Sequence, residues 1–307
     1  MSAATMAGSS AAELRAGGTD VSERRRSGVS AGPLIDLIPS AGMTGIAWGA
    51  DGAARIGAAT TIAAIAGDRQ IIAAYPGFAA AAGGLATPQL RHLATLGGNL
   101  AQHSRCWYYR HPHVSCLKKG GSDCPARRGN HLHGVAFDLG PCVAPHPSTM
   151  AAALLAYDGV VRTDRRPALS IPELLGDGSA GTADNALRPG EIIESIALSP
   201  PLANERALYQ RAIGRTHAEW PLVEIVARTV ISGGSFQLLR LAAGGVAPVP
   251  LRLSAAEAIG EGAAASASTM AAIAEQATAG ARPLPMTGYK LDLMKGLVRH
   301  LLERLVG

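Results

Sequence analysis

The four cysteines are the residues whose type and spacing most directly indicate chemistry in this chain. They lie close together in a sequence of 307 residues, at Cys106, Cys116, Cys124 and Cys142. Thiols clustered in this way in an intracellular protein favour a metal site over disulfides. None of them forms the tight pair that is usual in zinc fingers and bacterial ferredoxins. The spacing alone therefore leaves three alternatives open: an iron–sulfur cluster, a zinc site, or no metal.

Basic side chains among the cysteines would help to offset the charge of four thiolates, although ordinary solvent exposure would also explain them. They are Arg105, Arg110, Lys118, Lys119, Arg127 and Arg128. His131 and His133 have a spacing that could ligate a metal, but such histidines more often form hydrogen bonds. No hydrolytic triad is recognisable in the chain.

Two glycine pairs mark loops that could approach a phosphate closely. They occur in Ala16–Asp20 and in Ala94–Leu100. Glycine has no Cβ to block the approach, and consecutive backbone amides can form an anion-binding nest. Neither loop has the G-x-G-x-x-G pattern of a Rossmann fold. Because Asp20 would repel a bare phosphate, we expect its carboxylate to orient the loop or to cap the next segment.

Composition narrows the class of protein. With 48% hydrophobic residues, 17% charged residues and a net charge of +5, the chain is globular and is not predicted to bind nucleic acid. Glycine and proline interrupt the longest uncharged stretch, residues 71–90, so no membrane span is predicted. Without a recognisable export signal we expect a cytoplasmic protein, which could be co-exported folded with a signal-bearing partner.

Periodicity and turn residues predict the elements that must position these loops. We expect a buried strand over 33–38, a hairpin of 46–48 and 54–56, and helices from Ala59–Thr61 onward and over 68–82. Residues 102–145 lack periodicity, and so long an irregular segment requires a reason such as a bound metal cluster. The later elements are predicted as a helix over 149–157, strands near 160, 191–198, 207–212, 222–231 and 235–243, and helices over 253–260, 268–280 and 289–306.

Five motifs, taken in order, resemble the FAD-binding subunit of the xanthine dehydrogenase, or molybdenum hydroxylase, family. They are Ala16-Gly-Gly-Thr-Asp20, Ile56-Gly-Ala-Ala-Thr-Thr61, Ala94-Thr-Leu-Gly-Gly-Asn-Leu100, His146-Pro-Ser148 and Gly244-Gly-Val-Ala-Pro248. The resemblance implies an α+β fold with a PCMH-type (vanillyl-alcohol-oxidase-like) FAD-binding domain of two subdomains, residues 1–52 and 53–199. It also implies a C-terminal α+β domain, residues 200–307, like that of the carbon monoxide dehydrogenase flavoprotein.

The cysteine-containing segment narrows the resemblance to one branch of this family. It is similar to the flavin subunits of periplasmic aldehyde oxidoreductase and 4-hydroxybenzoyl-CoA reductase, in which the corresponding loop binds an additional [4Fe–4S] cluster. The resemblance thus implies that Cys106, Cys116, Cys124 and Cys142 are cluster ligands.

Position by position, the resemblance also implies a set of FAD-binding residues. Arg15, Ala16, Gly17, Gly18, Thr19, Asp20, Val21 and Ser22 would wrap the pyrophosphate, and Thr95, Gly98 and Asn99 would form the second flavin loop. Leu85 would lie near the isoalloxazine, Ile192 or Ile193 would pack on the cofactor, and Arg211 would contact the flavin or its phosphates. At Thr149 the family usually has aspartate, so a usual FAD contact is changed from carboxylate to hydroxyl.

The resemblance implies a heteromeric oxidoreductase in which this chain has no general base of its own. A large molybdenum-cofactor subunit would oxidise an aldehyde or N-heterocycle, and a small subunit with [2Fe–2S] clusters would pass electrons to FAD and then to an acceptor. Two alternatives stay open. The first is a stand-alone FAD oxidase, and the second is a scaffold with structural zinc on the four cysteines.

Overall fold

Three β-sheets organise the computed structural model, which describes residues 12–216 and 218–307. The first sheet is a parallel pair of β1 (Glu13–Arg15) and β2 (Leu34–Asp36), connected through the short helix α1 (Val21–Arg26). The predicted strand over 33–38 is therefore present as β2. The expectation that it is buried is wrong, because β2 has a single neighbour and its residues are half-buried or exposed.

The second sheet is antiparallel, with the strand order β3-β4-β7-β5-β6. Its strands are β3 (Ile46–Trp48), β4 (Ala54–Gly57), β5 (Val160–Thr163), β6 (Leu169–Ser170) and β7 (Ile193–Leu198). The predicted hairpin of β3 and β4 is confirmed, and Gly52 supplies the positive φ of +84° that its turn needs. β7 pairs with both β4 and β5, so it is the central strand of the sheet.

Short helices accompany this second sheet. They are α2 (Ile62–Gly67), α3 (Arg69–Ala74), α4 (Pro76–Gly84), α5 (Pro88–Leu93), α6 (Leu96–Leu100), α8 (Thr149–Ala156) and α9 (Ile171–Leu175). α6 and α9 contact its strands, and the others pack on one another or on the third sheet. The Thr61 side chain caps α2 by accepting a hydrogen bond from the amide of Ala64, as predicted. The single helix expected over 68–82 is instead two helices, because a residue that precedes proline, here Tyr75, disfavours the α conformation.

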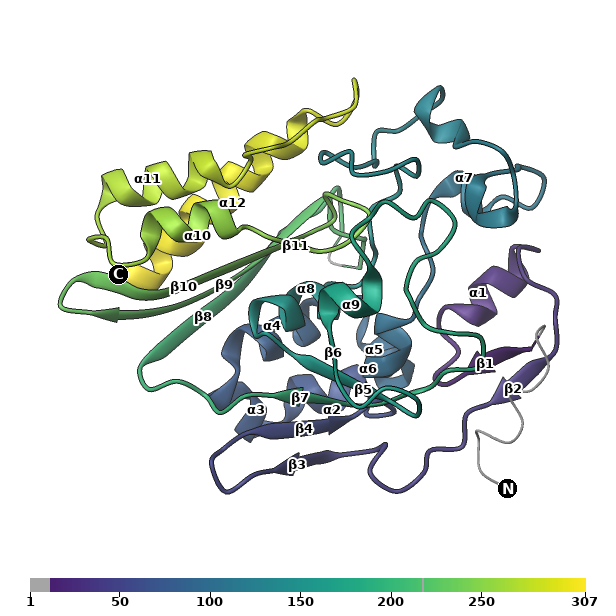
Figure 1. Ribbon diagram of the computed structural model, residues 1–307, viewed down its shortest axis with the longest axis horizontal. Coiled ribbons are helices and arrows are strands. Elements are labelled where there is room, and N and C mark those ends of the chain that lie inside the picture. Colours follow the sequence, from purple (N-terminus) through teal and green to yellow (C-terminus); the bar gives the residue numbers. More distant parts are fainter. Residues whose placement is uncertain (1–11, 217) are drawn as a thin grey trace.

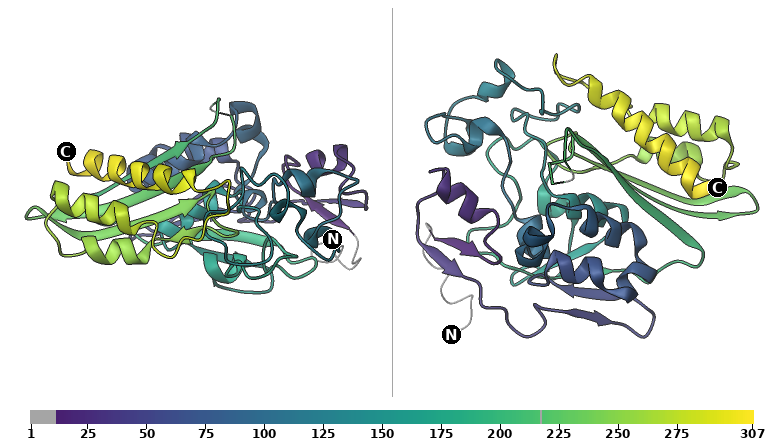
Figure 2. Two further views of the ribbon diagram at one scale, coloured as in Figure 1. Left: turned by 90° about the horizontal axis from the view of Figure 1, so that it is seen from above. Right: turned by 180° about the vertical axis from the view of Figure 1, so that it is seen from behind.

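The third sheet has helices on both of its faces (Figures 1 and 2). Its strands, in the order β11-β10-β9-β8, are β8 (Glu205–Ala212), β9 (Val223–Ser232), β10 (Ser235–Gly244) and β11 (Leu251–Arg252). α4 and α8 cover one face, and α12 (Tyr289–Val306) lies on the other with α10 (Ser254–Gly260) and α11 (Ala267–Gln276). The predicted apolar face of α12 is confirmed for its buried residues Met294, Val298, Leu301, Leu302 and Leu305.

Residues 102–145 form a long loop that leaves α6 and re-enters at α8, and Figure 1 shows this loop beside α1. As predicted, it has little regular structure: only α7 (Trp107–Arg110) and the 3-10 turns η2 (Leu117–Lys119) and η3 (Pro125–Arg127). We call it the cysteine loop. Among the described residues, no helix combines the length and apolar character that a bilayer-spanning segment needs.

We propose a division of the chain into 1–52, 53–199 and 200–307, of which residues 1–11 lie outside the described part. β3 ends before residue 52 but is hydrogen-bonded to β4 of the second part. The first two parts therefore share one sheet.

Candidate functional site

A cleft opens between the β1–α1 segment and the second sheet. It encloses about 970 Å³ of space, part of it open to solvent. Both glycine loops border it: residues 16–21 from one side, and Thr95, Gly97 and Gly98 from the other. Ile192 and Ile193, at the start of β7, add an apolar wall. The cleft thus joins a backbone-lined part to an apolar part, the combination that a dinucleotide with a flat ring system requires.

The two glycine loops lie against each other because Gly17 has no side chain. A Cβ at Gly17 would stand 1.7 Å from the carbonyl oxygen of Leu93, directly before the second loop. Gly18 has a φ of +72°, a conformation that side chains disfavour. In the second loop, Thr95 caps α6 by accepting a hydrogen bond from the amide of Gly98 at 3.2 Å. The close approach of the two backbones, with no side chain at Gly17 between them, fits the pyrophosphate of FAD.

The structure brings nine of the predicted FAD residues to this cleft. They are Ala16, Gly17, Gly18, Thr19, Asp20, Val21, Thr95, Gly98 and Ile192. The other six lie around it without lining it. Ser22 stands behind Gly18, where a Cβ would be 3.3 Å from its Oγ. Arg15 turns outward to an ion pair with Asp36, and Leu85 is buried in the core at the end of α4.

Three other predicted residues form hydrogen bonds with groups that do not line the cleft. Asn99 Oδ1 accepts a hydrogen bond from Ser148 Oγ at 2.6 Å, which connects α6 to the start of α8. Thr149 Oγ1 donates to Glu224 Oε2 at 2.9 Å, and Arg211 on β8 donates to the carbonyl of Glu219 at 3.3 Å. These contacts direct all three side chains to groups other than the cleft lining. Their predicted contacts with FAD stay predictions.

Thr149 belongs to a buried polar group that connects α8 with the third sheet. Tyr209 Oη also donates to Glu224 Oε2, at 2.8 Å. Burial raises the pKa of Glu224, and it raises the pKa of Tyr209 as well. A carboxylate at position 149, as the family usually has, would face the carboxyl of Glu224. The hydroxyl of Thr149 supplies a donor there instead.

Sequence reasoning missed several residues that line the cleft. Arg24 follows the first loop, Gln102 and His103 follow the second, and Glu191 precedes the predicted Ile192. Their signal was proximity to the glycine loops, since a cleft built from loops includes the residues where those loops end. Glu13 and Leu14 belong to β1, a strand that was not predicted.

All four cysteines line one small cavity in the cysteine loop, together with Tyr108, Tyr109 and Lys118. Burial raises the pKa of the Cys106 thiol. A hydrogen bond between Cys124 and Cys142 lowers the pKa of the former and raises that of the latter. No group of three or more His, Cys, Asp or Glu side chains in the described ranges is arranged around a single metal ion. Thiolates are the usual ligands of iron–sulfur clusters, so the chemistry of the four thiols that line this cavity fits such a cluster.

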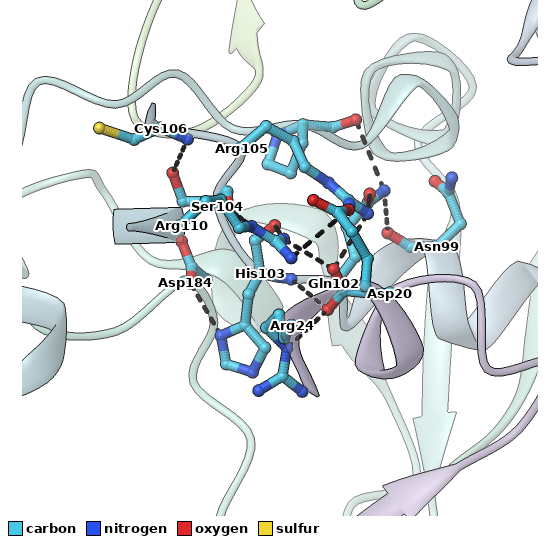
Figure 3. A network of polar contacts seen from close by, with 12 residues as sticks. Asp20, Arg24, Asn99, Gln102, His103, Ser104, Arg105, Cys106, Arg110 and Asp184 are labelled. Carbon is cyan, nitrogen blue, oxygen red and sulfur yellow. Dashed lines mark hydrogen bonds and ion pairs between the residues drawn. The ribbon is translucent and has the colours of Figure 1, made fainter. Parts of the chain in front are cut away.

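An ion-pair network joins the cysteine loop to the first glycine loop (Figure 3). The carboxylate of Asp20 accepts from Arg110 NH2 at 2.7 Å and lies 3.0 Å from Arg105 NH2. It also accepts from Arg24 Nε and from the amide of His103, both at 3.2 Å. Burial would raise the pKa of Asp20, but the Arg105 charge and the Arg110 hydrogen bond outweigh it and lower that pKa.

A second polar bridge runs from the cleft to the cysteine cavity. His103, which lines the cleft, lies with Nδ1 3.0 Å from Asp184 Oδ2. Lys118, which lines the cavity, lies with Nζ 2.8 Å from Asp184 Oδ1. Burial alone would raise the pKa of Asp184, but the contacts with His103 and Lys118 hold it well below its usual value. The cleft and the cavity are therefore close neighbours.

Comparisons with known proteins agree with this architecture. Residues 2–201 match the family model described as FAD binding domain in molybdopterin dehydrogenase, and residues 209–305 match the CO dehydrogenase flavoprotein C-terminal domain. The chain is 31% identical to the aldehyde oxidoreductase FAD-binding subunit PaoB of Escherichia coli K12, over 92% of this chain and 88% of that protein. It is 25% identical to the xanthine dehydrogenase FAD-binding subunit of Escherichia coli O157:H7, over 86% and 77%.

Solved structures share the fold over almost the whole chain. Carbon monoxide dehydrogenase from Hydrogenophaga pseudoflava superimposes with a TM-score of 0.76 at 22% identity, covering 98% of this chain and 92% of that one. Quinoline 2-oxidoreductase from Pseudomonas putida 86 gives a TM-score of 0.76 at 18% identity, covering 99% and 93%. Both confirm the predicted α+β fold.

The chain belongs to the family of FAD-binding subunits of the molybdenum hydroxylases. It is an oxidoreductase subunit, and the predicted resemblance is confirmed, including its similarity to an aldehyde oxidoreductase flavin subunit. The iron–sulfur cluster, the individual cofactor ligands and the partner subunits stay predictions.

Proposed function

We propose that this chain is the electron-transferring subunit of a heteromeric molybdenum hydroxylase that oxidises an aldehyde or an N-heterocycle. It would hold FAD in the cleft and a [4Fe–4S] cluster on Cys106, Cys116, Cys124 and Cys142. A large molybdenum-cofactor subunit and a small [2Fe–2S] subunit would be its partners. The observation that carries the proposal is the position of the thiol-lined cavity directly behind the cleft, with Asp184 bridging His103 and Lys118.

Bound FAD would supply a chemistry that no side chain has, the exchange of electrons one at a time with iron–sulfur centres and singly or in pairs with an acceptor. The chain itself binds and orients. The backbone of residues 16–21 and of Thr95 and Gly98 would hold the pyrophosphate, with Ser22 and Asn99 behind these loops, and Ile192 would pack on the cofactor. Leu85, Thr149 and Arg211 are proposed by position, with Arg15 at the entrance to the first loop.

The test is the cofactor content of the chain after anaerobic purification. The chain is purified once by itself and once together with its co-expressed partners. We expect about one FAD per chain, with about four irons and four sulfides, and a visible spectrum that shows both chromophores. Flavin without iron would remove the cluster and keep the FAD subunit. Stoichiometric zinc without iron would favour the structural scaffold, and robust substrate turnover by the isolated chain would favour a stand-alone oxidase.

A further inference from the structure

We propose that Asp20 is a positioning residue through which the cysteine loop and the FAD cleft control each other. In this proposal Arg105 and Arg110, both from the cysteine loop, hold the Asp20 carboxylate and thereby fix the shape of the first glycine loop. Order in the cysteine loop and affinity for FAD would then rise and fall together. The inference rests on the proposed function, since it takes FAD and a metal cluster as the two ligands.

Asp20 stands at the point where the first glycine loop becomes helix α1. It is the N-cap residue of α1, yet its side chain makes no capping hydrogen bond. The carboxylate instead points to the cysteine loop, as Figure 3 shows. Oδ1 contacts Arg105 and Arg110, and Oδ2 accepts from Arg24 and from the backbone of His103. Most of what orients this carboxylate therefore lies outside its own loop.

Arg110 connects this carboxylate to the segment that presents the first cysteine. Its Nε donates to the carbonyl of Ser104 at 2.8 Å, and its NH2 donates to the carbonyl of His103 at 3.0 Å. Ser104 Oγ in turn accepts from the amide of Cys106 at 3.2 Å. One guanidinium thus spans the distance from the glycine loop to the turn before the thiol.

Arg105 extends the connection to the second glycine loop. Its NH2 donates to Gln102 Oε1 at 3.0 Å, and Gln102 Nε2 donates to the carbonyl of Asn99 at 2.8 Å. A change in the path of the cysteine loop would therefore reach both sides of the cleft. Because Arg105 and Asn99 are joined through a buried glutamine, the connection is shielded from water.

Burial makes the contact between Asp20 and Arg110 strong enough to transmit such a change. Their side chains are only 15% and 9% exposed, and Arg105 is 17% exposed. Arg110→Gln removes one of the three arginines around the buried Asp20 carboxylate, which should cost more than breaking an exposed pair. Arg128 and Asp123 form an exposed pair in the same loop, with side chains 78% and 47% exposed.

Thermodynamic linkage makes the effect reciprocal. If cluster binding orders the segment 102–110 and this segment fixes Asp20, then the cluster raises FAD affinity by the same factor by which FAD raises cluster affinity. The element common to both sites is a set of named ion pairs. The coupling should therefore vanish when these pairs are removed.

The experiment measures the dissociation constant of FAD by equilibrium dialysis, on the full chain with the cluster and after its chemical removal. The variants are Asp20→Asn, Arg110→Gln and Arg110→Lys. Arg299→Gln is the control, because Arg299 forms an exposed pair with Glu303 on α12, outside the cysteine loop. Thermal unfolding and iron content are recorded for every protein.

In the wild type, removal of the cluster should weaken FAD binding about tenfold, within the usual range of coupling between two sites. In Asp20→Asn and Arg110→Gln, FAD should bind about tenfold more weakly with the cluster present, and cluster removal should then change little. Arg110→Lys should recover part of the affinity, and Arg299→Gln should behave as the wild type. A residue that only stabilises the fold would lower the unfolding temperature without abolishing the dependence on the cluster.

Two results would overturn the proposal. One is an equal effect of cluster removal in the wild type and in Asp20→Asn, and the other is wild-type FAD affinity in Arg110→Gln. A wild-type chain that contains FAD but no iron would instead refute the proposed cluster. In that case the comparison of Arg110→Gln with Arg299→Gln still decides whether Asp20 positions the flavin loop.

Discussion

The FAD cleft and the cysteine loop are adjacent but are stabilised in opposite ways. The cleft rests on a large apolar core in which Ile56, Leu96 and Ile196 are fully buried. Within the cysteine loop, Ala126, Val135 and Val143 form a small apolar cluster, Ala136 and Phe137 join the core beneath the third sheet, and ion pairs and hydrogen bonds hold much of the remainder. Apolar burial therefore specifies the first region, whereas the proposed cluster would act as a crosslink that holds the path of the second.

The largest effect should follow when the crosslink is removed. Cys116→Ser takes a buried thiol from the cavity, and we expect the chain to lose its iron. The free energy of local unfolding of residues 102–145 should fall by about 3 kcal/mol or more, because metal binding and loop folding are coupled. Hydrogen exchange measured by mass spectrometry tests this. The exposed Ser122→Ala is the control, and unchanged protection of the loop in Cys116→Ser would contradict the comparison.

In the cleft, the contact between the two glycine loops depends on the absence of a side chain at Gly17. Gly17→Ala places a Cβ on the Leu93 carbonyl, so the two glycine loops must separate. Overpacking of this kind should cost about 2–3 kcal/mol and reduce FAD retention, which bound-flavin absorbance measures. Gly67→Ala, with open space around its Cβ, should leave the FAD content unchanged. Normal flavin content in Gly17→Ala would refute the predicted contact between the loops.

The pH dependence of stability tests how Lys290 anchors the cysteine loop to α12. Lys290 Nζ donates to the carbonyl of Gly245 at 2.7 Å and lies 3.5 Å from that of His133. Burial lowers the pKa of Lys290 to about 7. Above this value the unfolded state binds a proton that the folded state lacks. Stability therefore rises with pH until the ordinary lysine pKa is reached.

We expect Lys290→Met to lose this rise, which should amount to about 2 kcal/mol from pH 7 to pH 9. Urea unfolding at both pH values measures the effect. Lys295→Met is the control, since Lys295 is on the same helix as Lys290 but forms a partly exposed pair with Glu275 of α11. Equal pH slopes in the wild type and in Lys290→Met would show that Lys290 is not buried as described.

The smallest effect concerns the support behind the cleft. Thr149→Val removes one of the two hydroxyl donors to Glu224 and should cost about 1 kcal/mol. Combining it with Glu224→Gln in a double-mutant cycle should give a non-additive result. Loss of stability with wild-type FAD affinity would assign Thr149 to the support. Weaker FAD binding would instead support the direct contact between residue 149 and FAD that the family resemblance implies.

Regular elements could be predicted from the sequence because their signals are local. The cap of α2 at Thr61, the turn at Gly52 and the apolar face of α12 each follow from neighbouring residues. Pro76 also indicates the break of the helix at Tyr75, although the predicted helix over 68–82 runs through it. β1 was missed because a three-residue strand carries too few positions for a period.

The candidate site was less predictable wherever side chains from distant segments meet. The convergence of the four cysteines on one cavity was expected from the family resemblance, since their spacing alone left other readings open. The contacts of the Asp20 carboxylate with Arg105 and Arg110 could not be predicted from the sequence. Asp20 and Arg110 are 90 positions apart, and no local pattern connects them. The burial of Lys290 in an otherwise apolar helix face was likewise invisible to a hydrophobic pattern.

The strand order of the second sheet also has a consequence for how the protein is made. β4, which ends at Gly57, has β7 as its central neighbour, and β7 ends at Leu198. During translation β4 cannot pair with β7 until Leu198 has left the ribosome, and strand pairs so distant in the chain form slowly. The cysteine loop emerges inside this interval, before Ile192 can complete the cleft. The nascent chain therefore presents its thiols to the cell well before it can retain a flavin.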